Sequence, residues 1–280
     1  MAKLGANRYG KSRVRLSRIT RLADRHEFNE WTVHVMSYGN FDTSFTESDN
    51  STVLPTDTMK NTVYYVARNS KAATIEAFAI ELGDYFLDNN PQVTKVSIVV
   101  EEKAWERITI NGKAEATTFK LGGQELNTVL AVREKAGAWE VTSGVDGLTI
   151  LKTTKSAFTG YIKDKLTTLK PATDRIFGTR ATVKWDYATS TLDYAQVRTR
   201  IVSTLLKAFA EHNSMSVQHT LYDMGTAALD AAPEIARIHF SLPNLHHLLA
   251  DLSPFGLDNP NHIFVPIDEP HGTIEATIER

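Results

Sequence analysis

Apolar and polar residues alternate along several stretches of this chain, a pattern typical of β-strands with one buried face. Residues 13–19 place Val14, Leu16 and Ile19 among three arginines, which predicts a half-buried strand with a basic outer face. Such a face can recruit an anion, but it is more often simply solvated. Residues 30–36 (EWTVHVM) alternate again. We therefore expect these two segments to pair as a hairpin.

Further strands follow from the same pattern. Asn111-Gly112 between strand-like residues is a strong hairpin signal. The segment 40–52 is polar and loop-like, and Pro55-Thr56-Asp57 reads as a turn. The other strands are predicted at 62–67, 93–100, 119–132, 139–150, 181–187, 235–242, 248–252, 262–266 and 273–278.

Helical spacing replaces alternation in three places. Thr74 is a plausible N-cap, and the apolar residues after it recur at helical intervals until Asn89-Asn90-Pro91 ends the pattern. A long helix is predicted after Asp193, and another from 219 to about 231, before Pro233. A short strand or turn at 216–218 is expected to precede the last helix.

The order strands, helices, strands occurs twice, and the pattern restarts around Gly137. This order favours an α+β fold, with antiparallel sheets that carry helices on one face. We expect two domains, residues 1–137 and 138–280. Glycine-rich phosphate loops of the GxGxxG or GxxxxGK[ST] type do not occur in the sequence.

Composition narrows the function classes. A net charge of −2 and a pI near 6.5 argue against nucleic acid or a membrane surface as the main partner. Apolar runs stay short of the roughly 18–20 residues that a membrane span needs. Because the sequence contains no cysteine, thiolate metal sites, disulfides and cysteine nucleophiles are excluded.

Two side chains stand out as candidates for ligand binding. Phe158 offers an aromatic face, and Arg175 follows after a turn-rich loop. A planar ring with several oxygen atoms would stack on the phenyl group and accept two parallel hydrogen bonds from the guanidinium. Most phenylalanines are core residues and most arginines are solvated, so this pair does not identify a ligand by itself.

The histidines raise the question of a metal. Six of the nine lie beyond residue 215, yet none forms an HxxxH pair with an accompanying acid. His246 and His247 are adjacent, and on a strand they would point to opposite faces. We therefore expect no metal site, and one histidine of the pair as an acid, base or proton carrier.

Several short motifs of the chain together resemble urate oxidase (uricase). They occur in the order found in that family and cover nearly the whole chain from Tyr9 onward. These motifs are Tyr9-Gly10-Lys11, Thr56-Asp57-Thr58, Leu148-Thr149, Phe158 with Gly160, Asp174-Arg175-Ile176, Val217-Gln218, Leu242-Pro243-Asn244 with His246, and the run from Gly272 to Arg280.

The resemblance implies the tunnelling fold, with two tandem ββααββ units per chain and homotetramers around a central tunnel. It also implies active sites at subunit interfaces and the oxidation of urate by dioxygen and water, without a cofactor. The products would be 5-hydroxyisourate and hydrogen peroxide. A metal-dependent purine or pterin hydrolase of the same fold group and a non-catalytic urate-binding protein remain the alternatives.

The same resemblance assigns roles to individual residues. Phe158 would stack on the purine, and Arg175 and Gln218 would hold opposite edges of the ring, helped by the Val217 N–H. Thr56 and the Asp57 backbone would come from a neighbouring subunit. Asn244 and Thr56 would hold dioxygen or water. Lys11, Thr56 and His246 would relay protons.

Two positions depart from the pattern expected of the family. Thr159 stands where many relatives carry a bulkier aromatic residue, and Leu245 replaces a frequent lysine. The chain ends at Arg280, without the longer tail expected of bacterial relatives and without a peroxisomal Ser-Lys-Leu. We therefore expect either a bacterial protein located in the cytoplasm or a chain whose tail has been trimmed.

Overall fold

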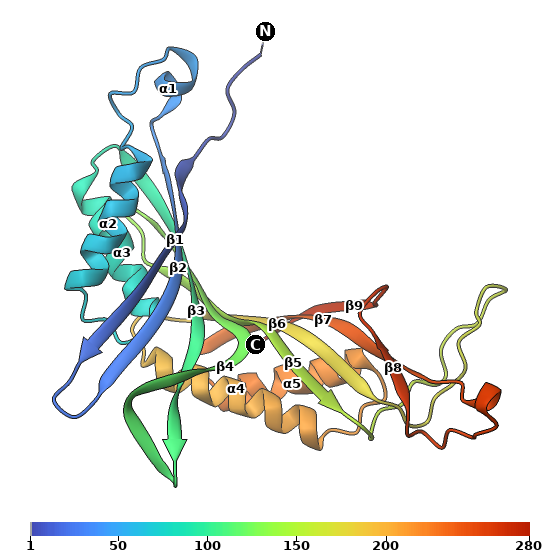
Figure 1. Ribbon diagram of the computed structural model, residues 1–280. Coiled ribbons are helices and arrows are strands. Elements are labelled where there is room, and N and C mark those ends of the chain that lie inside the picture. The colour runs from blue at the N-terminus through green and yellow to red at the C-terminus, as the bar shows by residue number, and fades with distance from the viewer. Residues whose placement is uncertain (1) are drawn as a thin grey trace. The chain divides into compact units, whose positions relative to one another are not determined.

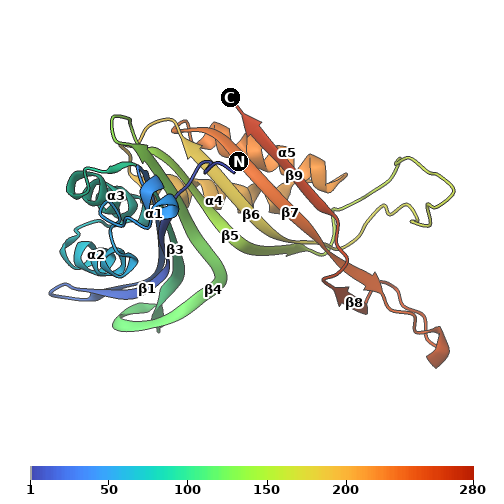
Figure 2. The same ribbon diagram turned by 90° about the horizontal axis from the view of Figure 1, so that it is seen from above.

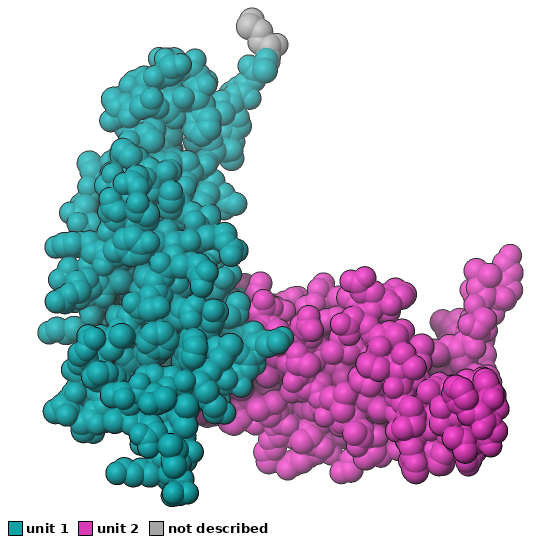
Figure 3. Space-filling model, in the orientation of Figure 1, with its two compact units in different colours: residues 1–145, 186–195 teal, residues 146–185, 196–280 magenta. Residues whose placement is uncertain are grey.

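The structure is a computed structural model that describes residues 2–280 (Figure 1). The chain forms two compact units (Figure 3). Unit 1 contains residues 1–145 and 186–195, and unit 2 contains residues 146–185 and 196–280. The domain boundary expected between residues 137 and 138 lies in the connection between strands β4 and β5.

Unit 1 is an antiparallel sheet with helices on one face (Figures 1 and 2). Its strands pair in the order β1-β2-β3-β4, and helices α2 and α3 pack on the sheet. The elements are β1 (Tyr9–Arg21), β2 (His26–Gly39), α1 (Asp42–Thr46), α2 (Thr56–Asn69), α3 (Ile75–Asn89), β3 (Val93–Ile110) and β4 (Lys113–Glu134). Apart from the short α1, this order is ββααββ.

Alternation explains which strand residues enter the core of unit 1. Trp31, Val33 and Val35 of β2 are buried, and the Trp31 ring stacks on Phe78 of α3 with 4.6 Å between ring centroids. The expected hairpin between β1 and β2 is confirmed. The turn between β3 and β4 is also as predicted, because Asn111 and Gly112 both have positive φ.

The inward face of β1 differs from the expectation in one respect. Val14 is buried and Leu16 is half-buried, and strict alternation turns Arg18 to this same side. Ile19 therefore faces outward and is 45% exposed, while the Arg18 guanidinium lies 4.6 Å from the centre of the Trp31 ring. The basic face predicted for this strand is thus divided between its two sides.

The predicted strand at residues 62–67 is wrong, because this segment belongs to helix α2. Its β-branched and aromatic residues suggest a strand, but the buried residues Met59, Val63, Val66 and Ala67 recur at helical spacing. Packing of this stripe on the sheet outweighs the local preference. The Thr56-Asp57 turn is likewise replaced by the first turn of α2.

Helix α3 begins as predicted. The Ala77 N–H donates to the Thr74 side chain at 3.3 Å, which caps the helix. Glu76 in its first turn is 1% exposed, and the Ser143 hydroxyl donates to its carboxylate at 2.5 Å. A buried carboxylate depends on such donors for its stability.

Replacing Ser143 with alanine is expected to reduce the free energy of unfolding by about 1–3 kcal/mol, since Glu76 loses a buried hydrogen bond. A thermal unfolding scan of the Ser143→Ala variant measures the effect. Thr118→Ala, at an exposed position of β4, is a control of similar size outside this pair. Equal melting temperatures for wild type and Ser143→Ala would contradict the prediction.

Unit 2 repeats the arrangement, with helices α4 and α5 on one face of its strands (Figure 2). Buried side chains such as Phe177, Trp185, Ile201, Leu205 and Phe240 form its core. The strand order is β5-β6-β7-β8, and β9 pairs with β7. The elements are β5 (Glu140–Lys152), which begins in unit 1, β6 (Phe177–Tyr187), α4 (Tyr194–Glu211), α5 (Val217–Ala231), β7 (Ile235–Leu249), η1 (Ser253–Phe255), β8 (Phe264–Ile267) and β9 (Thr273–Glu279).

The α+β architecture with two ββααββ repeats is therefore confirmed. Residues 235–242 and 248–249, expected in two separate strands, belong to the single strand β7, and residues 250–252, expected in the second of them, lie outside any strand. None of the helices described in residues 2–280 combines the length and the apolar character needed to cross a bilayer.

Candidate functional site

Unit 1 contributes Lys11, Thr56 and Asp57 of the predicted site. Lys11 lies in β1 opposite Val35, directly before an irregularity where Arg13 has a positive φ. Thr56 and Asp57 are the first two residues of α2, after Pro55. N–H groups in the first turn of a helix have no partner within the helix, so they remain available as donors to a ligand.

The Asp57 carboxylate links this helix end to β1 electrostatically. Its pKa lies below the ordinary value, mainly because Lys60 donates a hydrogen bond to it at 2.5 Å. Asn61 and the charge of Lys11 contribute in the same direction. Since the Asp57 side chain is bound to Lys60 and Asn61, its backbone N–H is the group left for a ligand.

Unit 2 brings Phe158 and Arg175 together, as the sequence analysis anticipated. The Arg175 guanidinium carbon lies 5.4 Å from the centre of the Phe158 ring. Phe158 exchanges two backbone hydrogen bonds with Ala172, at 2.8 and 3.1 Å, which close the loop between them. Phe158 and Arg175 therefore lie at the base of a loop whose ends are joined by backbone hydrogen bonds.

Asp174, the residue before Arg175, is held in place by hydrogen bonds. Its carboxylate accepts hydrogen bonds from the Thr154 hydroxyl at 2.7 Å and from the Ser156 N–H at 3.4 Å. The Thr154 bond is the main reason why the pKa of Asp174 is low. Burial lowers the pKa of Arg175, and its Nε has no partner within residues 2–280. A partly desolvated guanidinium with an unused donor favours an anionic ligand.

Tyr161 is a residue of this site that the sequence analysis missed. Its ring is stacked on that of Phe158, with 5.0 Å between centroids and 12° between planes, and its hydroxyl donates to the Leu169 carbonyl at 2.6 Å. The spacing Phe158-x-x-Tyr161 was the available signal. One face of Phe158 is therefore occupied by Tyr161, and a stacked ligand uses the other face or displaces it.

Val217 and Gln218 begin helix α5, so the strand or turn expected at 216–218 is wrong. Ser216 caps the helix by accepting a hydrogen bond from the His219 N–H at 3.1 Å. Val217 is buried, whereas Gln218 is exposed. Val217 and Gln218 are thus the first two residues of α5, just as Thr56 and Asp57 are the first two residues of α2.

Asn244 and His246 lie on β7 and, by alternation, share one face of the strand. Leu245 and His247 lie on the opposite face, next to Gly178 of β6. Both side chains approach the same side of this glycine: a Cβ atom built there would lie 3.5 Å from Leu245 Cβ and 3.6 Å from His247 Cε1. The prediction that the adjacent histidines face opposite sides is therefore confirmed. The Asn244 N–H donates to the Gly272 carbonyl at 2.8 Å, which ties two of the sequence motifs together.

The structure thus collects the predicted residues into two groups. Lys11, Thr56 and Asp57 belong to unit 1. The second group belongs to unit 2 and comprises Phe158, Arg175, Val217, Gln218, Asn244 and His246. Within residues 2–280, no three histidine, aspartate or glutamate side chains are placed to hold a metal ion together.

Two ββααββ repeats define a tunnelling-fold protein. The uricase family profile matches residues 7–132 and 141–275. The chain is 43% identical over 278 residues to the uricase of Arthrobacter globiformis, covering 99% of this chain and 90% of that protein. It is 38% identical over 283 residues to the uricase of Dictyostelium discoideum, covering 100% and 98%. The chain belongs to the uricase family.

Solved structures agree with this assignment. The crystal structure of Arthrobacter globiformis uricase superposes with a TM-score of 0.94 at 42% identity, covering 100% of this chain and 96% of that one. A urate oxidase structure from Bacillus sp. TB-90 shares the fold, with a TM-score of 0.85 at 23% identity.

Proposed function

We propose that this protein is a urate oxidase of purine catabolism that converts urate, dioxygen and water into 5-hydroxyisourate and hydrogen peroxide, without a metal or flavin. The proposal is supported by the relatives named uricase. The structural observation that carries it is the Arg175 guanidinium held 5.4 Å from the Phe158 ring. This pair matches a flat anion with carbonyl groups at its edge.

Substrate binding follows from these side chains. Urate stacks on Phe158, and Arg175 donates two parallel hydrogen bonds to one edge of the ring. Gln218 binds the opposite edge, and the Val217 N–H at the start of α5 donates to the anion. The positive end of the α5 dipole adds to this stabilisation. A purine without the matching groups would leave buried polar atoms unpaired.

We further propose that each active site forms between two chains of a homotetramer. Lys11, Thr56 and the Asp57 N–H would come from unit 1 of one chain, and Phe158, Arg175 and their partners from unit 2 of its neighbour. Thr56 and Asn244 would hold dioxygen or water above the ring. The two groups are thus complementary: one carries the substrate-binding side chains, and the other carries the lysine.

For the oxidation of urate, the protein needs to orient urate and dioxygen and to transfer protons. Dioxygen has a triplet ground state, so a closed-shell anion reacts with it by one-electron transfer followed by recombination of the radicals. Deprotonated urate is a good electron donor. Lys11, Thr56 and His246 would move the protons between urate, water and peroxide, while the site holds the reactants in place. Water supplies the hydroxyl group of the product, and dioxygen leaves as peroxide.

Three further statements belong to the proposal. Residues 1–137 and 138–280 would be the first and the second tunnelling-fold domain. A cytoplasmic location in a bacterium remains a prediction. Urate and dioxygen, rather than nucleic acid or a membrane, would be the partners.

Near-ultraviolet absorbance of urate tests the proposed activity directly. We expect loss of urate only when oxygen is present, one peroxide per urate, and no effect of a chelator. Saturable binding without turnover would replace the oxidase by a urate-binding protein. Activity lost to the chelator and restored by zinc would favour the metal-dependent hydrolase.

A mixture of two impaired variants tests the shared site. When Lys11→Met and Arg175→Ala chains are co-expressed, a hybrid pair contains one site free of both substitutions. At a urate concentration well below the weakened Kd of Arg175→Ala, random pairing should restore about a quarter of the wild-type activity, whereas each variant alone stays far below that level. Co-expression without recovery, in oligomers shown to contain both chains, would place the whole site within one chain.

A further inference from the structure

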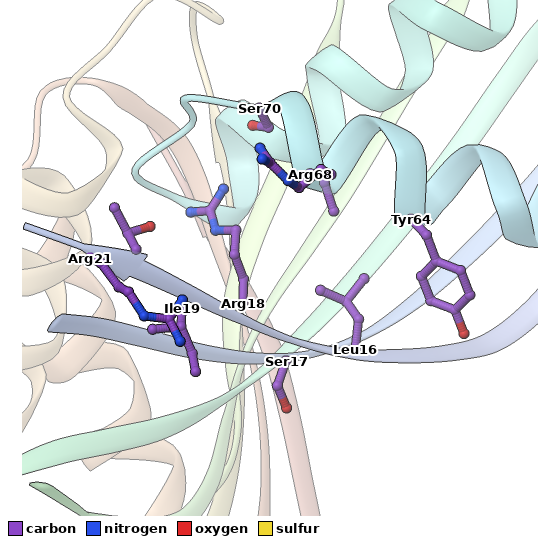
Figure 4. Close-up of a pocket in the computed structure, with 10 residues that line it drawn as sticks. Leu16, Ser17, Arg18, Ile19, Arg21, Tyr64, Arg68 and Ser70 are labelled. Atoms are coloured by element: carbon purple, nitrogen blue, oxygen red, sulfur yellow. The ribbon is translucent and has the colours of Figure 1, made fainter. Parts of the chain in front are cut away.

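A groove of about 720 Å³ lies in unit 1 between β1 and α2 (Figure 4). It falls in the range of volumes typical of small-molecule sites. Residues of β1 form one side, and the C-terminal half of α2 and the residue after it form the other. Its lining includes Leu16, Arg18, Arg21, Tyr64, Arg68 and Ser70.

All the charged side chains that line this groove are arginines. Arg18, Arg21 and Arg68 line it, and the lining contains no aspartate or glutamate. No ion pair with another residue of the 2–280 range neutralises Arg21 or Arg68. Figure 4 shows the side chains of Arg18, Arg68 and Ser70 gathered at one end. Like charges held together in this way favour a bound anion.

Arg18 is held in place before any ligand arrives. It packs over the Trp31 ring, and one terminal nitrogen donates to the Ala72 carbonyl at 2.7 Å. Glu81 and Glu102 are the carboxylates that interact with its charge, but neither reaches ion-pair distance in the part of the chain that the structure describes. Glu102 accepts hydrogen bonds from Asn29 and Trp31 instead. The guanidinium is thus held by Trp31 and the Ala72 carbonyl, half-buried, and without an ion-pair partner among the described residues.

The other end of the groove is apolar. Leu16 lies between the arginine cluster and Tyr64, a residue that is 44% exposed (Figure 4). A ring face and a leucine side chain offer a surface on which a flat group stacks. The groove therefore suits an elongated ligand that has an anionic head and a flat, largely apolar body.

This groove is separate from the residues assigned to the oxidase site. Arg18 lies about 23 Å along β1 from Lys11, at roughly 3.3 Å per strand residue. Arg68 lies about 18 Å along α2 from Thr56, at roughly 1.5 Å per helical residue. The two sites thus occupy opposite ends of the same strand and helix.

We propose that the groove binds a phosphate monoester that carries a planar ring, of the nucleoside monophosphate class. The phosphate accepts forked hydrogen bonds from Arg18 and Arg68, with Arg21 adding charge at the rim. The ring lies along Leu16 and stacks on Tyr64. A bare phosphate would fill only the arginine end of a groove of this volume.

Calorimetric titration of the assembled protein at low salt tests the proposal, with adenosine 5′-monophosphate, inorganic phosphate and adenosine as probes. The nucleotide is expected to bind at least about tenfold more tightly than phosphate or adenosine, and saturating urate without oxygen should not displace it. The titration requires no turnover, so its result does not depend on the oxidase activity. Absent binding, equal affinity for phosphate, or displacement by urate would overturn the assignment.

Variants locate the binding within the groove. Arg68→Gln should weaken nucleotide binding by about tenfold or more, and Tyr64→Ala should weaken nucleotide but not phosphate binding. Both residues are exposed, so the variants should keep the fold. Arg180→Gln, an exposed arginine of β6, is the charge-matched control. Nucleotide affinity unchanged by Arg68→Gln, or lowered equally by Arg180→Gln, would contradict the site.

Discussion

Replacing Arg175 with alanine is expected to weaken urate binding by about 2–4 kcal/mol, roughly 30- to 1,000-fold. The guanidinium is partly desolvated, its Nε has no partner within residues 2–280, and Phe158 lies beside it. Folding has therefore already removed part of the water around Arg175. Urate binding costs less desolvation as a result, and the two charge-assisted hydrogen bonds contribute more of their free energy to affinity. Alanine removes this gain and leaves one edge of the buried urate anion without donors.

Anaerobic titration with urate measures this loss, because turnover is then prevented. Arg180→Ala is the matched control, since Arg180 is exposed on β6. Circular dichroism separates loss of the ligand contact from collapse of the loop that Phe158 and Ala172 close. Near-normal affinity in a folded Arg175→Ala variant would remove Arg175 from the urate site.

The sheet could be predicted from the sequence because one buried face imposes a period of two. Residues 30–36 and the Asn111-Gly112 turn show this directly, and both lie where expected. The α2 helix could not be predicted in the same way. Its Thr62–Ala67 segment has the composition of a strand, and only packing against β1 reveals the helical stripe that includes Val63 and Val66.

Some residues of the candidate site could likewise be predicted from the sequence, and others could not. Phe158 and Arg175 could be paired in advance because one loop joins them and each has an evident role. The roles of Thr56 and Val217 could not be predicted from residue type in this way. Both are the first residue of a helix, and the N–H groups left free there exist only once the backbone has folded. Tyr161 escaped notice because stacking on Phe158 depends on how the loop closes. The arginine groove arises from Arg18 turning inward, which the alternation of β1 predicts once Val14 is fixed as buried.

Lys11→Met is expected to lower kcat by about 10²–10⁴-fold and to change urate affinity far less. Methionine keeps the unbranched length of lysine but removes the charge and the exchangeable proton. Lys11 lies near the Asp57 carboxylate, which is already bound by Lys60 and Asn61, so the ammonium group is left for the proton relay. Steady-state oxygen consumption gives kcat, and anaerobic titration gives the affinity.

Separation of the two constants is what distinguishes a proton carrier from a binding group. A lysine that only attracts urate would act equally on the ground state and the transition state, so affinity and kcat/KM would fall together while kcat stayed unchanged. A lysine that moves protons to and from Thr56 acts only while bonds change, so kcat falls and the pH dependence of kcat changes with it. Lys113→Met, at the tip of the β3–β4 hairpin, controls for the loss of one positive charge. Lowered affinity with an unchanged kcat for Lys11→Met would exclude Lys11 from the relay and leave Thr56 and His246 to carry it.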